Sequence, residues 1–134
     1  MSDKIQIYLF IALGSAIGGV GRYWFADYIA RRLGETFPWG TILVNISGSF
    51  LIGFIAALGR PQSRFAMSSL ALQFLMLGMC GGYTTFSSFS LQTLTLARQG
   101  EWMAAGGNIV VSVALCLIAV WLGFLLGHFL SRAV

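Results

Sequence analysis

Residues 78–90 read Gly-Met-Cys-Gly-Gly-Tyr-Thr-Thr-Phe-Ser-Ser-Phe-Ser and lie inside a long apolar segment. The adjacent glycines Gly81 and Gly82 weaken a helix, and the hydroxyl side chains after them put polar groups where a membrane helix would have apolar ones. Backbone that is not helical survives at membrane depth only when it is buried in protein or lines a wet cavity. The stretch therefore indicates either a tolerated kink or a broken helix whose freed backbone groups bind an ion.

The composition indicates that the whole chain lies in a membrane. Of its 134 residues, 57% are hydrophobic and 9% are charged, whereas a soluble domain has roughly 25% charged residues. The apolar residues form four blocks, each of which meets the length of about 20 residues that is needed to cross the hydrocarbon core. We therefore expect an all-α integral membrane protein, with residues 1–134 as one domain of four transmembrane helices and the third helix broken mid-membrane. The blocks run approximately from Ile5 to Ala30, Trp39 to Leu58, Phe65 to Ala97 and Trp102 to Leu130.

Several classes of function lack the residues that they need. A proton-coupled carrier needs a carboxylate at membrane depth, and no acid is placed mid-membrane. No nucleophile has a base and an orienting partner, so we do not expect an enzyme. The net charge of +4 is spread too thinly for a nucleic-acid surface. The four acids are Asp3, Asp27, Glu35 and Glu101.

The loops carry nearly balanced positive charge. The Lys and Arg bias that normally orients a membrane protein is therefore almost absent. Either the chain inserts in both orientations, or the insertion machinery reads a modest bias. One side would carry Lys4, Arg60, Arg64 and Arg132, and the other Arg31, Arg32 and Arg98.

Polar residues recur in the second and fourth blocks, each of which begins with a tryptophan. Asn45 and Asn108 each follow that tryptophan by six positions, so we expect both amides at the same depth, roughly 9 Å below one interface. Ser49 and Ser112 lie one turn deeper on the same faces. These stripes either bond helix to helix or form a shared polar path.

The first helix carries Gly14, Gly18 and Arg22 at successive i+4 spacings. The glycines indicate a close helix contact. Arg22 lies toward the end of this helix, where its side chain either snorkels to the interface or faces an aqueous vestibule. Asp27 has a structural role in this interpretation and pairs with Arg22 or Arg31.

Phe86 and Phe89 are an aromatic pair at i+3 spacing in the polar stretch. An aromatic ring is positive at its edge, so both rings can face an anion edge-on. They can equally pack in the core. A path lined by such rings, by amides and by hydroxyls would offer an ion only neutral donors.

Two motifs resemble those of a known family. Residues 81–90 resemble the GGxTTFSTFS signature of the Fluc (CrcB) fluoride channels, and residues 40–50 resemble the GTLxxNxxGxF motif of their second helix. The glycine-rich first helix, the four-helix layout and the length agree with that family. The resemblance implies a passive channel of the bacterial inner membrane that exports fluoride, built as an antiparallel dual-topology homodimer with two pores and surrounded by membrane lipid.

The resemblance also implies roles for particular residues. The rings of Phe86 and Phe89 would flank the fluoride path, and a structural sodium ion would lie at the dyad. The remaining pore residues would be Asn45, Thr85, Ser112 and Asn108, the sodium ligands would be the backbone carbonyls of Gly81 and Thr84, and Arg22 would lie in the vestibule.

Several positions depart from the family pattern, among them Leu91 in place of a common alanine. Tyr83 occupies a position that is usually apolar, Ser88 replaces a common threonine, and Gln92 replaces a common glutamate. The last change puts the vestibule role of that acid in doubt. A different class of protein, a small antiparallel-dimer transporter of drugs or cations, is the alternative, against which the missing intramembrane carboxylate counts.

Overall fold

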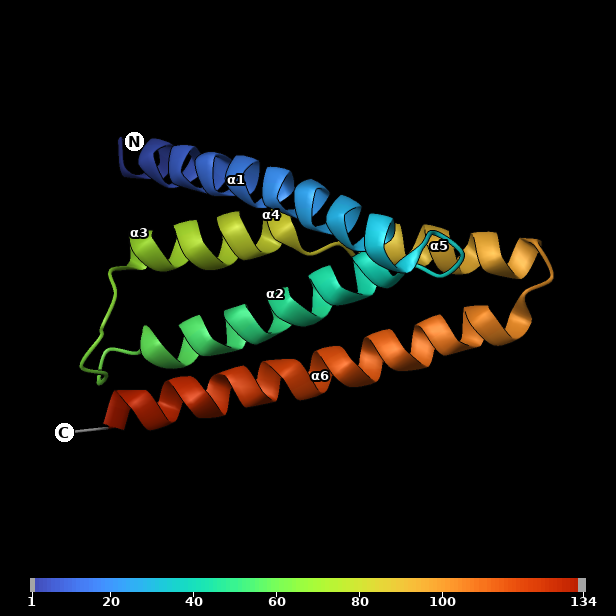
Figure 1. Ribbon diagram of the computed structural model, residues 1–134. Helices are drawn as coiled ribbons and strands as arrows, with labels where there is room; N and C mark the ends of the chain where they lie inside the picture. Colours follow the sequence, from blue (N-terminus) through green and yellow to red (C-terminus); the bar gives the residue numbers. More distant parts are fainter. Residues whose placement is uncertain (1, 133–134) are drawn as a thin grey trace.

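In a computed structural model, which describes residues 2–132, the chain is a bundle of helices lying side by side, and α1 begins at the same end of the bundle at which α6 finishes (Figure 1). Of the described helices, three are long and apolar enough to cross a membrane, and they match the first, second and fourth predicted blocks. The third block is a series of shorter helices. In chain order the elements are α1 (Ser2–Leu33), α2 (Trp39–Leu58), α3 (Ser69–Leu72), the π-helix η1 (Gln73–Cys80), α4 (Gly81–Tyr83), α5 (Phe86–Arg98) and α6 (Trp102–Arg132).

The large apolar side chains mostly face outward. Only 17% of the most apolar 18-residue stretch of α6 is buried inside the protein, and only 11% of the corresponding stretch of α1 is buried. The fully buried side chains are few, and Ile42 and Val44 are among the largest of them. An apolar surface of this extent is stable when lipid covers it. The chain is therefore a multi-pass membrane protein.

The helices form two pairs, α2 with α6 and α1 with η1 and α4 (Figure 1). In the first pair, a Cβ atom on Gly53 would clash with the carbonyl oxygen of Val120 and would lie 3.1 Å from the Phe124 nitrogen. From the other side, a Cβ atom on Gly123 would clash with the carbonyl oxygen of Phe50. These glycines let the two backbones touch, which is how many membrane helices associate.

The packing of α2 on α6 corrects one prediction. The sequence predicts equal depths for Asn45 and Asn108, but Asn45 shares a cavity wall with Ser112 and Leu117, further along α6. The first residues of α2 and α6 do not lie level, because α5 carries the chain past the start of α2 before it turns back into α6 (Figure 1). The prediction of equal depth is therefore wrong, and Asn45 lies level with Ser112.

The predicted close contact of the first helix is confirmed. A Cβ atom on Gly14 would lie 2.9 Å from the Cα atom of Gly78 in η1. One turn later, a Cβ atom on Gly18 would clash with the carbonyl oxygen of Met79 and would lie 2.8 Å from the Tyr83 nitrogen. The backbone of α1 therefore lies directly against the segment that leads to the polar stretch.

Replacing Gly18 by alanine is expected to lower the free energy of unfolding by about 1–3 kcal/mol, because the added methyl group meets backbone atoms that cannot rotate away. The adjacent Gly19 is the matched control, since nothing lies within 4 Å of a Cβ atom at that position. There, alanine is expected to be neutral or slightly stabilising. Thermal unfolding of both variants in detergent measures the difference, and equal melting temperatures would contradict the packing described here.

Candidate functional site

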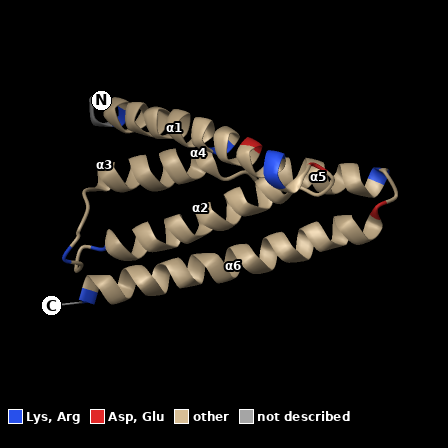
Figure 2. Ribbon diagram, in the orientation of Figure 1, with Lys and Arg blue, Asp and Glu red and all other residues tan. Residues whose placement is uncertain are grey.

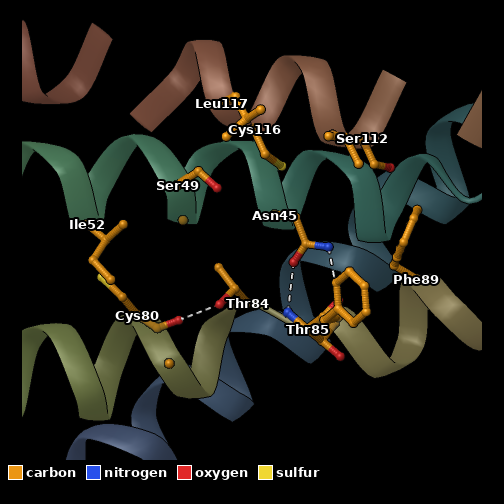
Figure 3. Close-up of a pocket in the computed structure, with 14 residues that line it drawn as sticks. Asn45, Ser49, Ile52, Cys80, Thr84, Thr85, Phe89, Ser112, Cys116 and Leu117 are labelled. Carbon is orange, nitrogen blue, oxygen red and sulfur yellow. Dashed lines mark hydrogen bonds between the residues drawn. The ribbon is translucent and has the colours of Figure 1, made fainter. Parts of the chain in front are cut away.

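A cavity of about 350 Å³ opens between α2, the junction of α4 with α5, and α6 (Figure 3). It brings together most of the residues that the sequence predicts for an ion path, although they come from three separate parts of the chain. None of the described side chains on its wall is charged. The predicted residues on the wall are Asn45, Gly81, Thr84, Thr85, Phe86, Phe89 and Ser112.

The backbone between α4 and α5 is extended for two residues. Thr84 has φ −80° and ψ 157°, and Thr85 has φ −151° and ψ 112°. The helix does not end at the adjacent glycines, since Gly81 is helical, with φ −64° and ψ −39°. Gly82 is needed for packing instead, because a Cβ atom there would lie 2.6 Å from the carbonyl oxygen of Ser15 in α1.

The side chain of Asn45 holds this extended segment from α2. Its Oδ1 accepts a hydrogen bond from the Thr85 N–H at 2.7 Å, and its Nδ2 donates to the Thr85 carbonyl oxygen at 3.0 Å (Figure 3). The amide therefore satisfies both backbone groups that the interrupted helix leaves without a helical partner. One N–H of the Asn45 amide stays available to the cavity, because an amide nitrogen has two protons.

The two residues before Thr85 are held as well. The Tyr83 hydroxyl lies 3.0 Å from Ser47 Oγ, and it is the donor there, because Ser47 already donates its own proton to the carbonyl oxygen of Leu43 at 2.7 Å. Arg22 Nη1 lies 3.5 Å from the Thr84 carbonyl oxygen. Side chains of α1 and α2 thus contact the three successive residues Tyr83, Thr84 and Thr85. The hydroxyl of Tyr83, a residue unusual at this position of the motif, is hydrogen-bonded to Ser47.

Two carbonyl oxygens near the extended segment accept no backbone hydrogen bond across the junction from the described residues. The Thr85 N–H donates to Asn45 rather than back to Gly81, while the Thr84 N–H donates to the Cys80 carbonyl oxygen at 2.9 Å. Across the junction, no backbone N–H of the described residues donates to the carbonyl oxygen of Gly81 or Thr84. Unwound carbonyls of this kind suit a small hard cation such as sodium. The residues predicted as sodium ligands therefore fit that ion chemically.

The two phenylalanines of the motif differ in their surroundings. The centroids of the Phe86 and Phe89 rings are 5.2 Å apart and their planes are tilted by 49°. Phe89 is 8% exposed, whereas Phe86 is 76% exposed although it lies on the cavity wall. Packing inside this chain can therefore account for Phe89 but not for Phe86.

A chain of hydrogen bonds fixes the Phe89 turn to α6. Asn108, which is 1% exposed, donates to Thr93 Oγ1 at 2.7 Å, and Thr93 in turn donates to the Phe89 carbonyl oxygen at 2.8 Å. Ser112 donates to Asn108 Oδ1 at 3.2 Å. Ser112 lines the cavity, while Asn108 is not among the described residues on its wall. Thr93 was not predicted from the sequence, although its i+4 spacing places it on the same helix face as Phe89.

A second, polar recess of about 240 Å³ lies on the other side of Thr85. Arg22 lines it, together with Thr41 and Gln92. Gln92 Oε1 is buried and has no hydrogen-bond partner among the described residues, so a water molecule in the recess would satisfy it. Thr85 lines both spaces, so the recess lies beside the cavity that holds the phenylalanines.

Comparison with known proteins agrees with the motifs. Residues 9–124 match the family of CrcB-like proteins, Camphor Resistance (CrcB). The chain is 58% identical over 116 residues to the fluoride-specific ion channel FluC of Methylocella silvestris, covering 87% of this chain and 88% of that one. It is 53% identical over 125 residues to the protein of the same name from Paramagnetospirillum magneticum, covering 93% of this chain and 98% of that one.

Proposed function

The chain belongs to the CrcB family, and we propose on that premise that it is a passive, fluoride-selective ion channel of the bacterial inner membrane. The observation that carries the proposal is the uncharged cavity, whose wall combines Asn45, Ser112 and the two phenylalanines Phe86 and Phe89. Fluoride is small and tightly hydrated. A path for it must replace water with donors without trapping the ion beside a fixed positive charge.

The direction of transport follows from the membrane potential. Hydrogen fluoride from acidic surroundings crosses the membrane and dissociates in the more alkaline cytoplasm, so that fluoride accumulates inside. The potential, which is negative inside, drives the anion out through an open path. Arg22 lines the recess beside the cavity rather than the cavity itself. There it attracts the anion towards Thr85 without binding it along the path.

We place the working channel in an antiparallel, dual-topology homodimer with two pores. One supporting observation is Phe86, an apolar cavity residue that is 76% exposed in the single chain and therefore has room for a second chain. The nearly balanced positive charge of the two ends supports insertion in both orientations.

A structural sodium ion belongs to this proposal. One chain offers the carbonyl oxygens of Gly81 and Thr84, which are too few to replace a hydration shell. A second copy related by a two-fold axis would supply the matching pair. When bound, the ion would supply a positive charge that keeps the four carbonyl oxygens together.

The alternative, a small antiparallel-dimer transporter of drugs or cations, is less well supported. Such a protein would need a carboxylate along its substrate path. None of the acids among the described residues lines the cavity. The named relatives are ion channels, and we likewise propose no enzymatic activity.

Liposomes that contain only this protein are expected to release fluoride when a potassium shunt balances the charge, with chloride released far more slowly. A fluoride electrode and a chloride electrode measure both ions on one preparation. The requirement for a shunt separates a passive channel from an electroneutral exchanger. Equal rates for fluoride and chloride would refute the fluoride channel.

A further inference from the structure

Charge is distributed unequally between the two ends of the bundle. Basic residues lie at both ends, but the acids that Figure 2 shows lie toward the end where α1 passes into α2 and α5 into α6. There the acids have basic neighbours, as in the 2.8 Å ion pair between Asp27 and Arg31, which selects one of the two partners predicted for that acid. We call the opposite end, where α1 begins and α6 finishes, the basic end. Its basic residues are Lys4, Arg60, Arg64 and Arg132, and its one acid is Asp3, in the first turn of α1.

Part of the basic end gathers around one aromatic ring of α6. The guanidinium carbon of Arg60 lies 4.6 Å from the centroid of the Phe124 ring. The His128 ring is stacked against the same ring, with centroids 6.3 Å apart and planes 13° apart. Arg132 follows His128 by four positions and so lies on the same helix face. These four residues, Arg60, Phe124, His128 and Arg132, form what we call the Phe124 cluster.

The cluster offers hydrogen-bond donors that the chain does not use. Stacking on a ring leaves the N–H groups of a guanidinium available, because they lie at its edge. In the described part of the chain, no acceptor receives a hydrogen bond from Arg60 or Arg132, and both side chains are exposed. Planar guanidinium groups match the oxygens of a phosphate in a bidentate manner.

The cluster also lies at the level of lipid headgroups. The 31 residues of α6 span roughly 46 Å at about 1.5 Å per residue. The hydrocarbon core is only about 30 Å thick, so the last turns of α6 reach the headgroup layer. Leu125 and Phe129 in the same segment are 42% and 72% exposed, and they provide apolar surface for acyl chains beside the basic groups.

We infer that the Phe124 cluster binds the phosphodiester headgroup of an anionic phospholipid. The site lies near the end of α6 and is separate from the ion path, because none of its four residues lines the cavity, so it holds whether or not the chain conducts fluoride. Arg60 and Arg132 supply the charge that distinguishes an anionic lipid from a zwitterionic one. Phe124 fixes Arg60 in place, because a cation–π contact orients the guanidinium before the lipid arrives.

Native mass spectrometry of the purified full chain, titrated with phosphatidylglycerol or with phosphatidylcholine of the same acyl chains, tests this inference. The variant is the double substitution Arg60→Gln with Arg132→Gln. Arg98→Gln is the matched control, since it removes an exposed arginine from the opposite end. Near an anionic surface each arginine contributes about 1 kcal/mol, so the double variant is expected to bind phosphatidylglycerol roughly 30-fold more weakly. The control is expected to bind as the unchanged chain does.

Each other result would overturn the inference. Unchanged affinity in the double variant would exclude the cluster, and equal affinity for the two lipids would exclude recognition of charge. Inorganic phosphate that competes as well as the lipid would show an anion site without lipid specificity. If the double variant lost dimer on size exclusion but kept its lipid affinity, Arg60 and Arg132 would be shown to contact a second chain instead.

Discussion

Replacing Asn45 by leucine is expected to abolish fluoride efflux and to destabilise the protein strongly. Leucine has the same branched arrangement of heavy atoms, but it leaves both the N–H and the carbonyl oxygen of Thr85 without their hydrogen bonds of 2.7 and 3.0 Å. Thr85 is only 7% exposed, and each buried polar group without a partner costs about 1–3 kcal/mol, so the loss is roughly 2–6 kcal/mol. Thermal unfolding in detergent and fluoride efflux from liposomes measure the two effects.

Ser49→Ala is the matched control for this change. Ser49 lies one turn along α2 on the same cavity wall, and the described residues give its side chain no hydrogen bond across to α4 or α5. Its loss is therefore expected to leave the melting temperature almost unchanged. If the Asn45→Leu protein melted like the control but failed to conduct, Asn45 would act on the ion directly, and its bonds to Thr85 would not be what stabilises the junction.

Some features of the fold and of the cavity follow directly from the sequence. Composition and the four apolar blocks predicted an all-helical membrane protein, because apolar length alone decides whether a segment can cross a bilayer. The glycine spacing predicted the contact at Gly18, because glycines on one face of a membrane helix let another backbone approach closely. The motif residues around Thr85 were found by their unusual polarity.

The relative height of the helices could not be predicted in the same way. Asn45 and Asn108 have equal spacings from their tryptophans, but equal spacing gives equal depth only when both helices start at the same level. That level depends on the length of α5, which places Asn108 outside the cavity and next to Thr93. Polarity alone also does not show whether an amide side chain faces an ion or bonds to the backbone. In the structure, the Asn45 amide bonds to the backbone of Thr85.

Phe86→Ile and Phe89→Ile are expected to reduce fluoride efflux by more than roughly tenfold each, while the dimer still forms. Isoleucine fills similar space, so a purely packing role predicts a small change. It lacks the positive ring edge that replaces water around the anion. The structure makes the Phe86 variant the more telling of the two, because that ring is 76% exposed in the single chain and the Phe89 ring is 8% exposed. Dimer yield on size exclusion and fluoride efflux are measured on the same preparations.

Phe50→Ile is the matched control for the aromatic pair. Phe50 and Phe54 are also neighbouring rings, 6.3 Å apart, but neither lies among the described residues of the cavity wall. Loss of an aromatic ring there is expected to leave efflux within about twofold, so that any general weakening of the bundle can be recognised. A Phe86→Ile dimer that conducts as fast as this control would mean that the Phe86 ring serves packing between chains. The fluoride path would then have to follow the amide of Asn45 and the hydroxyl of Ser112, which line the cavity without it.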